Sequence, residues 1–212
     1  MIRTAQQALQ RLREGNRRFV EHGTDGISFE ALKAWEQVGK DQAPSDIILG
    51  CSDSRVPAEI IFDQGLGDLF VIRVAGNVVA PSQVGSVEFA AEKFGTRLVV
   101  VLGHSCCGAV SATLDELERP SERRSHSLSS IVNRIRPSVE TLLESGAFTD
   151  RDKLLDTAIR ANIRSSVQHL RQGSLILEGL IANSGLRVVG AEYSLATGAV
   201  DFFDTLDVEA QA

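Results

Sequence analysis

The chain has 212 residues, 43% of them hydrophobic and 24% charged, and its 22 basic and 28 acidic side chains give a net charge of −6. This composition is that of a globular protein and excludes collagen, coiled-coil and disordered chains. The acidic balance disfavours nucleic acid as a partner, and no apolar run approaches the ~18 residues that cross a membrane. The start of the chain shows no apolar signal core, so we expect a cytoplasmic protein.

Two helices are predicted at the start of the chain. Apolar residues recur at helical spacing from Thr4 to His22, and Thr4 followed by Gln7 fits a capping box. Glycines then interrupt the pattern, and a second helix is expected from Ser28 to about Gly39. We expect residues 1–40 to form a helical arm whose apolar faces pack on this domain or on another subunit.

Beyond residue 46, apolar runs alternate with helical stretches. Continuous apolar runs suit strands that are covered on both faces, as in a parallel sheet, and the alternation is typical of α/β folds. The predicted strands are Ile47–Gly50, Leu69–Val74, Leu98–Leu102 and Leu186–Ala191, and the predicted helices are Ser82–Phe94, Ser127–Glu144 and Leu154–Arg171.

The last segment differs, because residues 193–203 read as a hairpin that bends at Gly198. We therefore predict one domain over residues 1–212, with the helical arm followed by an α/β core over 46–212. The fold class is α/β, with a mostly parallel central sheet, one antiparallel edge strand, flanking helices and the N-terminal helical arm.

Polar, chemically capable side chains follow two of the predicted strands. In open α/β sheets, ligands bind beyond the carboxyl ends of strands. A catalytic zinc takes three protein ligands and keeps a fourth position open. Cys51, His104 and either Cys106 or Cys107 would supply such a set, which suits a metal better than a cysteine–histidine dyad. The two motifs are Cys51-Ser52-Asp53-Ser54-Arg55 and His104-Ser105-Cys106-Cys107-Gly108.

Asp53 and Arg55 are expected to form a pair. They are two residues apart, so in an extended segment their side chains point to the same side and can make charge-assisted hydrogen bonds. Arg55 would hold Asp53 ionised. Asp53 would then either accept a hydrogen bond from a zinc-bound hydroxide or fill the fourth position of the metal, and the residues alone leave both states open.

Both motifs resemble those of the β-class carbonic anhydrases, as do Glu14–Phe19, Arg73–Asn77 and Gly85–Phe89. The resemblance implies one Zn²⁺ per chain on Cys51, His104 and Cys107, with Cys106 a small packed side chain. It implies that zinc-bound hydroxide attacks carbon dioxide and yields bicarbonate and a proton. The other residues that it marks are catalytic Asp53 and Arg55 and substrate-binding Gln42, Phe70, Phe89 and Gly108.

The resemblance also implies an assembly. Family members are homodimers or homotetramers, with active sites at the dimer interface and an exchanged N-terminal arm. Gln42 matches a glutamine that donates a hydrogen bond to substrate in the subtype whose zinc stays open. No tryptophan adjoins the first motif, as one does in the bicarbonate-inhibited subtype, and this favours the open subtype.

Two other functions compete with hydration of carbon dioxide. The same zinc site could hydrolyse carbonyl sulfide or carbon disulfide, as some relatives do. A non-catalytic zinc-binding protein is the second alternative, but a closed structural site needs a fourth protein ligand. Asp53 is the near candidate for that ligand, and Arg55 competes for it.

Overall fold

The computed structural model describes residues 3–23, 42–120 and 125–205. The second helix that we predicted, over Ser28–Gly39, lies outside these residues. The strands are β1 (Asp46–Gly50), β2 (Leu69–Arg73), β3 (Leu98–His104), β4 (Arg187–Tyr193) and β5 (Val200–Phe203). The helices are α1 (Ala5–His22), α3 (Ala58–Ile61), α4 (Pro81–Lys93), α5 (Gly108–Glu118), α6 (His126–Glu144), α7 (Arg151–Gln172) and α8 (Leu175–Asn183), with a 3-10 turn, η3, at Ala75–Asn77.

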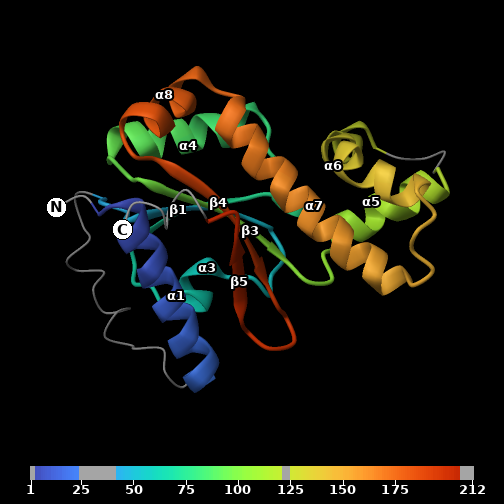
Figure 1. Ribbon diagram of the computed structural model, residues 1–212, viewed down its shortest axis with the longest axis horizontal. Helices are drawn as coiled ribbons and strands as arrows, with labels where there is room; N and C mark the ends of the chain where they lie inside the picture. Colours follow the sequence, from blue (N-terminus) through green and yellow to red (C-terminus); the bar gives the residue numbers. More distant parts are fainter. Residues whose placement is uncertain (1–2, 24–41, 121–124, 206–212) are drawn as a thin grey trace.

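The strands form one sheet in the order β2-β1-β3-β4-β5 (Figure 1). The pairs β1–β2, β1–β3 and β3–β4 are parallel, and only β4–β5 is antiparallel. This confirms the predicted mostly parallel sheet with one antiparallel edge strand. All the residues of β1 and β3 are buried, because helices cover both faces of these central strands.

Alternate residues of each strand contribute to two separate cores. Ile47, Leu49 and Val101 point to the face that carries α4, α5, α6, α7 and α8. Ile48 and Val100 point to the opposite face, where α1 and α3 pack. Because the strands need two apolar faces, their sequences are continuously apolar rather than alternating, which is why they were recognisable.

Helix α1 is fixed on the sheet of its own chain. Its predicted capping box is present, with Thr4 and Gln7 each bonding the backbone of the other. Asn16 is buried and joins the helix to two distant segments: its amide donates to Ile61 O at 3.1 Å and to Gly198 O at 2.9 Å. Whether this arm exchanges between subunits stays a prediction.

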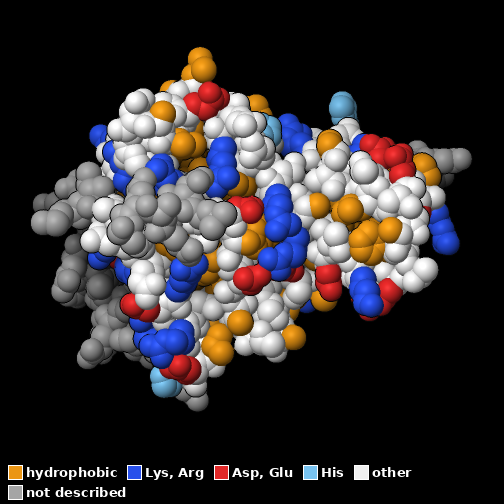
Figure 2. All heavy atoms as spheres, in the orientation of Figure 1, with side chains coloured by type: hydrophobic (Ala, Val, Ile, Leu, Met, Phe, Trp, Pro, Cys, Tyr) orange, Lys and Arg blue, Asp and Glu red, His pale blue; other side chains and the backbone are white. Residues whose placement is uncertain are grey.

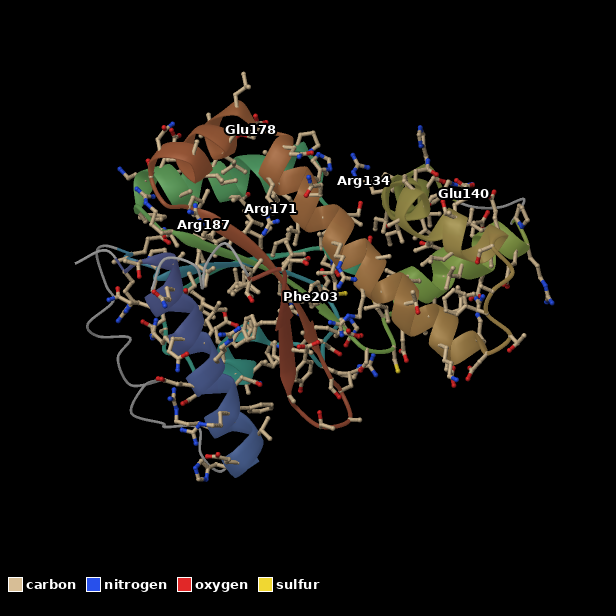
Figure 3. The ribbon with its side chains drawn as sticks, viewed as in Figure 1. Arg134, Glu140, Arg171, Glu178, Arg187 and Phe203 are labelled. Carbon is tan, nitrogen blue, oxygen red and sulfur yellow. The ribbon has the colours of Figure 1, made fainter. Side chains whose placement is uncertain are left out.

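Helix α7 crosses β4 and β5 and is tied to both by arginines. The Arg171 guanidinium, labelled in Figure 3, donates to Val188 O at 3.1 and 2.6 Å and to Asp204 O at 3.2 Å. Arg160 and Arg164 stack on the Phe203 ring, at 4.6 and 4.9 Å from its centroid. These contacts hold α7 along β4 and β5, from Val188 near the amino end of β4 to Phe203 of β5.

Two helices, α3 and α8, were not predicted from the sequence, whereas the start of α5 after Cys107 was expected. Helix α3 has a single turn, and α8 is apolar on most sides, so neither shows a helical period. Helix α5 runs to Glu118, into a segment that we expected to be a charged loop or helix end.

The surface of the described chain carries mixed charge. Figure 2 shows basic and acidic side chains interspersed over the face that presents α1, α7 and the β4–β5 hairpin. None of the described helices combines the length and the apolar character needed to cross a bilayer.

Candidate metal centre

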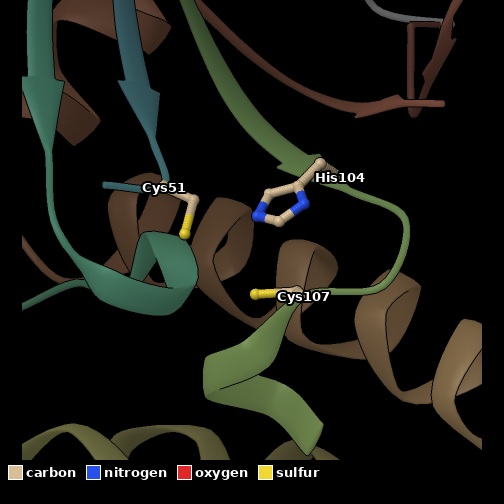
Figure 4. Close-up of side chains that lie close together, drawn as sticks. All are labelled: Cys51, His104 and Cys107. Carbon is tan, nitrogen blue, oxygen red and sulfur yellow. The ribbon is translucent and has the colours of Figure 1, made fainter. Parts of the chain in front are cut away.

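Three side chains from two adjacent strand ends converge on one point (Figure 4). Cys51 directly follows β1, His104 is the last residue of β3, and Cys107 is the N-cap of α5. All three are buried, and their ligand atoms lie within 4.8 Å of one another. The parallel pairing of β1 with β3 produces this meeting, because parallel neighbours end at the same edge of the sheet.

The His104 ring is oriented with one nitrogen free to bind a ligand. Its Nδ1 lies 3.0 Å from Ser105 O, and because a carbonyl only accepts, Nδ1 carries the proton. Nε2 is then an acceptor, and it is buried with no hydrogen-bond partner in the part of the chain that the structure describes. A buried acceptor left without a partner is costly, so its position beside two sulfurs favours a cation there.

The two buried thiols share their protons unequally. The pKa of Cys51 is lowered to about 4, chiefly because its sulfur accepts a hydrogen bond from the Cys107 thiol, with a further bond from the Gly76 amide. The pKa of the Cys107 thiol is raised, because it keeps the shared proton beside the Cys51 thiolate and is itself buried. Burial alone disfavours the charged form of His104, but the neighbouring Cys51 thiolate raises the pKa of the ring above its ordinary value.

This donor set fits zinc. Two sulfurs and one imidazole nitrogen are ligands that zinc prefers, and at usual bond lengths tetrahedral ligand atoms lie about 3–4 Å apart. The separations within 4.8 Å are compatible with that geometry. The cluster thus provides three ligands and leaves one position, which is the pattern of catalytic rather than structural zinc.

The predicted Asp53–Arg55 pair is present beside the cluster. Arg55 Nε donates to Asp53 Oδ1 at 2.9 Å and Nη2 donates to Oδ2 at 2.8 Å. These bonds hold the pKa of the Asp53 carboxyl well below its usual range. Asp53 Oδ2 lies 3.8 Å from His104 Nε2, so the carboxylate borders the space that a metal would occupy.

Arg73, at the end of β2, supports the loop that carries this pair. Its guanidinium donates to Cys51 O at 3.0 Å and to Asp53 O. In the sequence, Arg73 is marked only as part of the segment Arg73–Asn77 that resembles the family. A cation at the carboxyl end of an edge strand was the signal that could have marked it.

The structure corrects one expectation about the cysteines. Cys106 is exposed rather than packed. Its backbone is left-handed, with φ +57°. The preceding residue, Ser105, is hydrogen-bonded to the β4–β5 hairpin: its N–H donates to Tyr193 O, and its Oγ accepts from Leu195 N. This turn directs His104 and Cys107 inward and Cys106 outward.

Gly108 is the first residue of α5, and no other atoms fill the space where a side chain would lie. A Cβ built on Gly108 would meet no atom within 4 Å. Backbone N–H groups of the first helical turn have no partner within the helix, so this end can receive an anion.

Gln42, Phe70 and Phe89 lie elsewhere in the chain. Gln42 is exposed and precedes β1, whereas Cys51 follows it. The whole length of the strand, five residues at ~3.3 Å each, therefore separates the two residues. The Phe70 and Phe89 rings pack on each other at 6.2 Å and on Phe94, and Phe89 is 51% exposed. Phe94 follows the last turn of α4 and shortly precedes β3, so this aromatic group lies towards the amino ends of the strands.

Comparisons with known proteins agree on one family. A family model for carbonic anhydrase matches residues 46–200. A carbonic anhydrase of Mycolicibacterium smegmatis is 39% identical over 194 residues, which are 90% of this chain and 89% of that protein. Carbonic anhydrase 2 of Mycobacterium tuberculosis is 37% identical over 193 residues, 88% of this chain and 87% of that one. The structure of the β-carbonic anhydrase CcaA superposes with a TM-score of 0.73 at 26% identity, covering 93% of this chain and 96% of that one.

Proposed function

This chain belongs to the carbonic anhydrase family, in its β class, and on that premise we propose that it hydrates carbon dioxide reversibly at a zinc ion held by Cys51, His104 and Cys107. The general reaction of the family is carbon dioxide hydration. The observation that carries the zinc assignment is the convergence of two sulfurs on a buried His104 Nε2 that lacks a partner among the described residues. Zinc in such a site lowers the pKa of its water to near 7 and supplies a nucleophile at neutral pH.

Asp53 would orient the attacking water. Its carboxylate borders the metal side of His104, and an ionised carboxylate only accepts hydrogen bonds, so it would hold the proton of the water and leave the oxygen facing carbon dioxide. Arg55 donates to both carboxylate oxygens. Because those bonds would have to break before Asp53 could serve as a fourth ligand, they support the open form of the site over a closed, non-catalytic one.

The N-terminus of α5 would receive the charge that develops on the product. Bicarbonate is an anion, and the Gly108 amide belongs to the unpaired N–H groups at the start of an 11-residue helix. The absence of a side chain at Gly108 keeps this approach open. Preorganised amides of this kind stabilise transition-state charge without having to rearrange.

We propose that a second copy of the chain completes the site. Gln42 lies at the opposite end of β1 from Cys51, and Phe70 and Phe89 pack towards that same end. Substrate-binding roles for these residues therefore require the zinc of another subunit. The exposed edge of Phe89 is available for such a contact, which favours a homodimer or a larger homo-oligomer.

Neighbouring cysteines provide a matched test of the zinc assignment. Cys107→Ser should lose most bound zinc and the hydration activity together, because it removes a metal ligand. Cys106→Ser should keep one zinc per chain and near wild-type turnover, because the Cys106 side chain points outward. Zinc content and stopped-flow hydration are measured on both variants. Equal zinc and equal activity in Cys107→Ser would refute the assignment.

A further inference from the structure

We propose that Asn162 and Ser166 are positioning residues for the metal centre: from α7 they fix the η3 turn whose Gly76 amide donates a hydrogen bond to Cys51 Sγ. The inference rests on the proposed function, because it takes Cys51 as a zinc ligand.

A continuous set of hydrogen bonds connects α7 to the sulfur. Gly76 N donates to Cys51 Sγ at 3.4 Å. On the other side of the same residue, Asn162 Nδ2 donates to Gly76 O at 2.8 Å. Ser166 Oγ donates to Asn77 O at 3.0 Å, one residue further along. The two α7 side chains thus hold successive carbonyls of the turn, and this aims the Gly76 amide at the sulfur.

The turn needs this support, because its backbone is unusual. Gly76 has φ +69° and Asn77 has φ +44°, so two consecutive residues are left-handed. The Gly76 position is also crowded: a Cβ there would lie 2.8 Å from Ile135 Cδ1 and 3.1 Å from Ala109 Cβ. Conformations of this kind persist only where surrounding contacts determine them.

The placement of the two polar residues favours this specific role. Asn162 and Ser166 are 2% and 5% exposed and lie one turn apart on the buried face of α7, among Ile159, Ile163 and Val167. A polar group on such a face is costly unless it finds its partner. Both use that face to reach η3.

An amide hydrogen bond to a metal-bound thiolate changes the metal as well as the loop. It withdraws electron density from the sulfur and so stabilises the thiolate form that binds zinc. Outer partners of this kind typically contribute 10–100-fold to metal affinity. A purely structural hydrogen bond would contribute to folding and leave the sulfur unaffected.

The test measures the metal directly on the full-length protein. Zinc dissociation constants are determined by competition with a chelator, and the sulfur-to-metal absorption band is recorded after loading with Co²⁺. Asn162→Ala should weaken zinc binding by about 10–100-fold and move the band to longer wavelength, because the sulfur loses its hydrogen bond. Ser166→Ala should shift both readouts in the same direction, and Ser166→Thr, which keeps the hydroxyl, should restore them.

Val167→Ala is the matched control. It removes buried packing from the same face of α7 and carries no hydrogen bond, so it should lower the melting temperature while leaving affinity and band unchanged. A folded Asn162→Ala protein with wild-type affinity and band would overturn the proposal. If Asn162→Ala does not fold, the pair Ser166→Ala and Ser166→Thr decides, and identical readouts for these two would overturn it.

The same measurements separate this inference from the proposed function. If the wild-type chain bound no zinc, both the proposed function and the positioning role would be overturned. Alternatively, the chain could bind zinc and the variants could behave as predicted, while no carbon dioxide is hydrated. That result would refute the proposed reaction and support the positioning role.

Discussion

Hydrogen bonds with neighbouring residues orient the His104 ring, the Asp53 carboxylate and the Cys51 sulfur of the proposed metal centre. Ser105 O sets the His104 ring, Arg55 sets the Asp53 carboxylate, and the Gly76 amide meets the Cys51 sulfur. The bond to Ser105 O leaves His104 Nε2 free to bind a ligand. The site is therefore organised before any ligand arrives, which is what low reorganisation cost in catalysis requires.

Asp53→Ala should separate metal binding from catalysis. The variant is expected to keep one zinc per chain, because Cys51, His104 and Cys107 are untouched, but to lose about 100-fold in kcat/KM once the water is no longer oriented. Asp115→Ala, which removes an aspartate paired with Arg151 on the surface, is the control. Wild-type turnover in metal-replete Asp53→Ala would refute the orienting role.

Asp46 gives the stability of the fold a pH dependence. Its side chain is fully buried, and burial raises the pKa of its carboxyl despite a hydrogen bond from Ser45 and the charge of Arg11. With the folded pKa above the unfolded one, the folded state holds the proton longer, so this residue subtracts stability as pH rises through that window. Arg3 and Asp68 are the other charges that face it.

The stability of the Asp46→Asn variant relative to the wild type should therefore increase as pH rises. The difference in unfolding free energy between variant and wild type is expected to move in favour of the variant between pH 4 and pH 7, because only the wild type has a buried carboxyl to ionise. Urea denaturation at both pH values measures it. A difference that is constant with pH, or that moves towards the wild type, would contradict the raised pKa.

At the scale of elements, α1 depends on one close approach to the core. Gly15 lies against the backbone after α3, and a Cβ on it would come within 1.8 Å of Phe62 O. The glycine lets the helix sit deeply enough for Asn16 to bond Ile61 O and Gly198 O. Helix propensity and packing thus make opposite demands at this position.

Gly15→Ala should destabilise the protein although it improves the helix. Alanine adds about 1 kcal/mol of helix propensity, but the clash with a fixed carbonyl should cost more, for a net loss of roughly 1–3 kcal/mol. Gly179→Ala in α8 is the matched control: its Cβ meets nothing within 4 Å, so it should stabilise by up to about 1 kcal/mol. Denaturant unfolding compares the two, and a stabilised Gly15→Ala would show that α1 does not dock as described.

The elements that could be predicted are those with a local signal. Helix α1 has a capping box and apolar residues at helical spacing, and β1 and β3 are unbroken apolar runs between turns. Helix α8 lacks a period because apolar residues occur around most of its circumference. The proposed metal ligands were likewise visible because they lie at or shortly after the ends of apolar strands. The bond from Asn162 to Gly76, by contrast, joins residues 86 positions apart and leaves no local trace in the sequence.

At the scale of the whole molecule, three of the residues that the resemblance marks for substrate binding, Gln42, Phe70 and Phe89, lie away from the proposed metal site of their own chain. Cys51 follows the carboxyl end of β1 and Gln42 precedes its amino end. The sequence resemblance assigned both to one site, and strand direction separates them within a subunit. Only an assembly that brings the amino end of one sheet to the carboxyl end of another reconciles the two.

Subunit complementation tests this arrangement. Cys51→Ser removes the zinc of its own chain, and Gln42→Ala should keep zinc but hydrate carbon dioxide slowly. In a hybrid dimer, the zinc of the Gln42→Ala chain would meet the intact Gln42 of its partner. Refolding the two variants together should restore activity, up to about a quarter of wild type with random pairing. No gain over the separate variants would place Gln42 outside the shared site.

The central claim is that Cys51, His104 and Cys107 hold a zinc that hydrates carbon dioxide in an open site. Stopped-flow hydration by wild-type protein with quantified zinc, scanned from about pH 6.5 to 9, tests it most directly, because this range brackets the expected pKa near 7 of the activated water. We expect zinc-dependent turnover across the whole range. Activity confined to the alkaline end would contradict the open site, and no turnover with one zinc per chain would contradict the reaction itself.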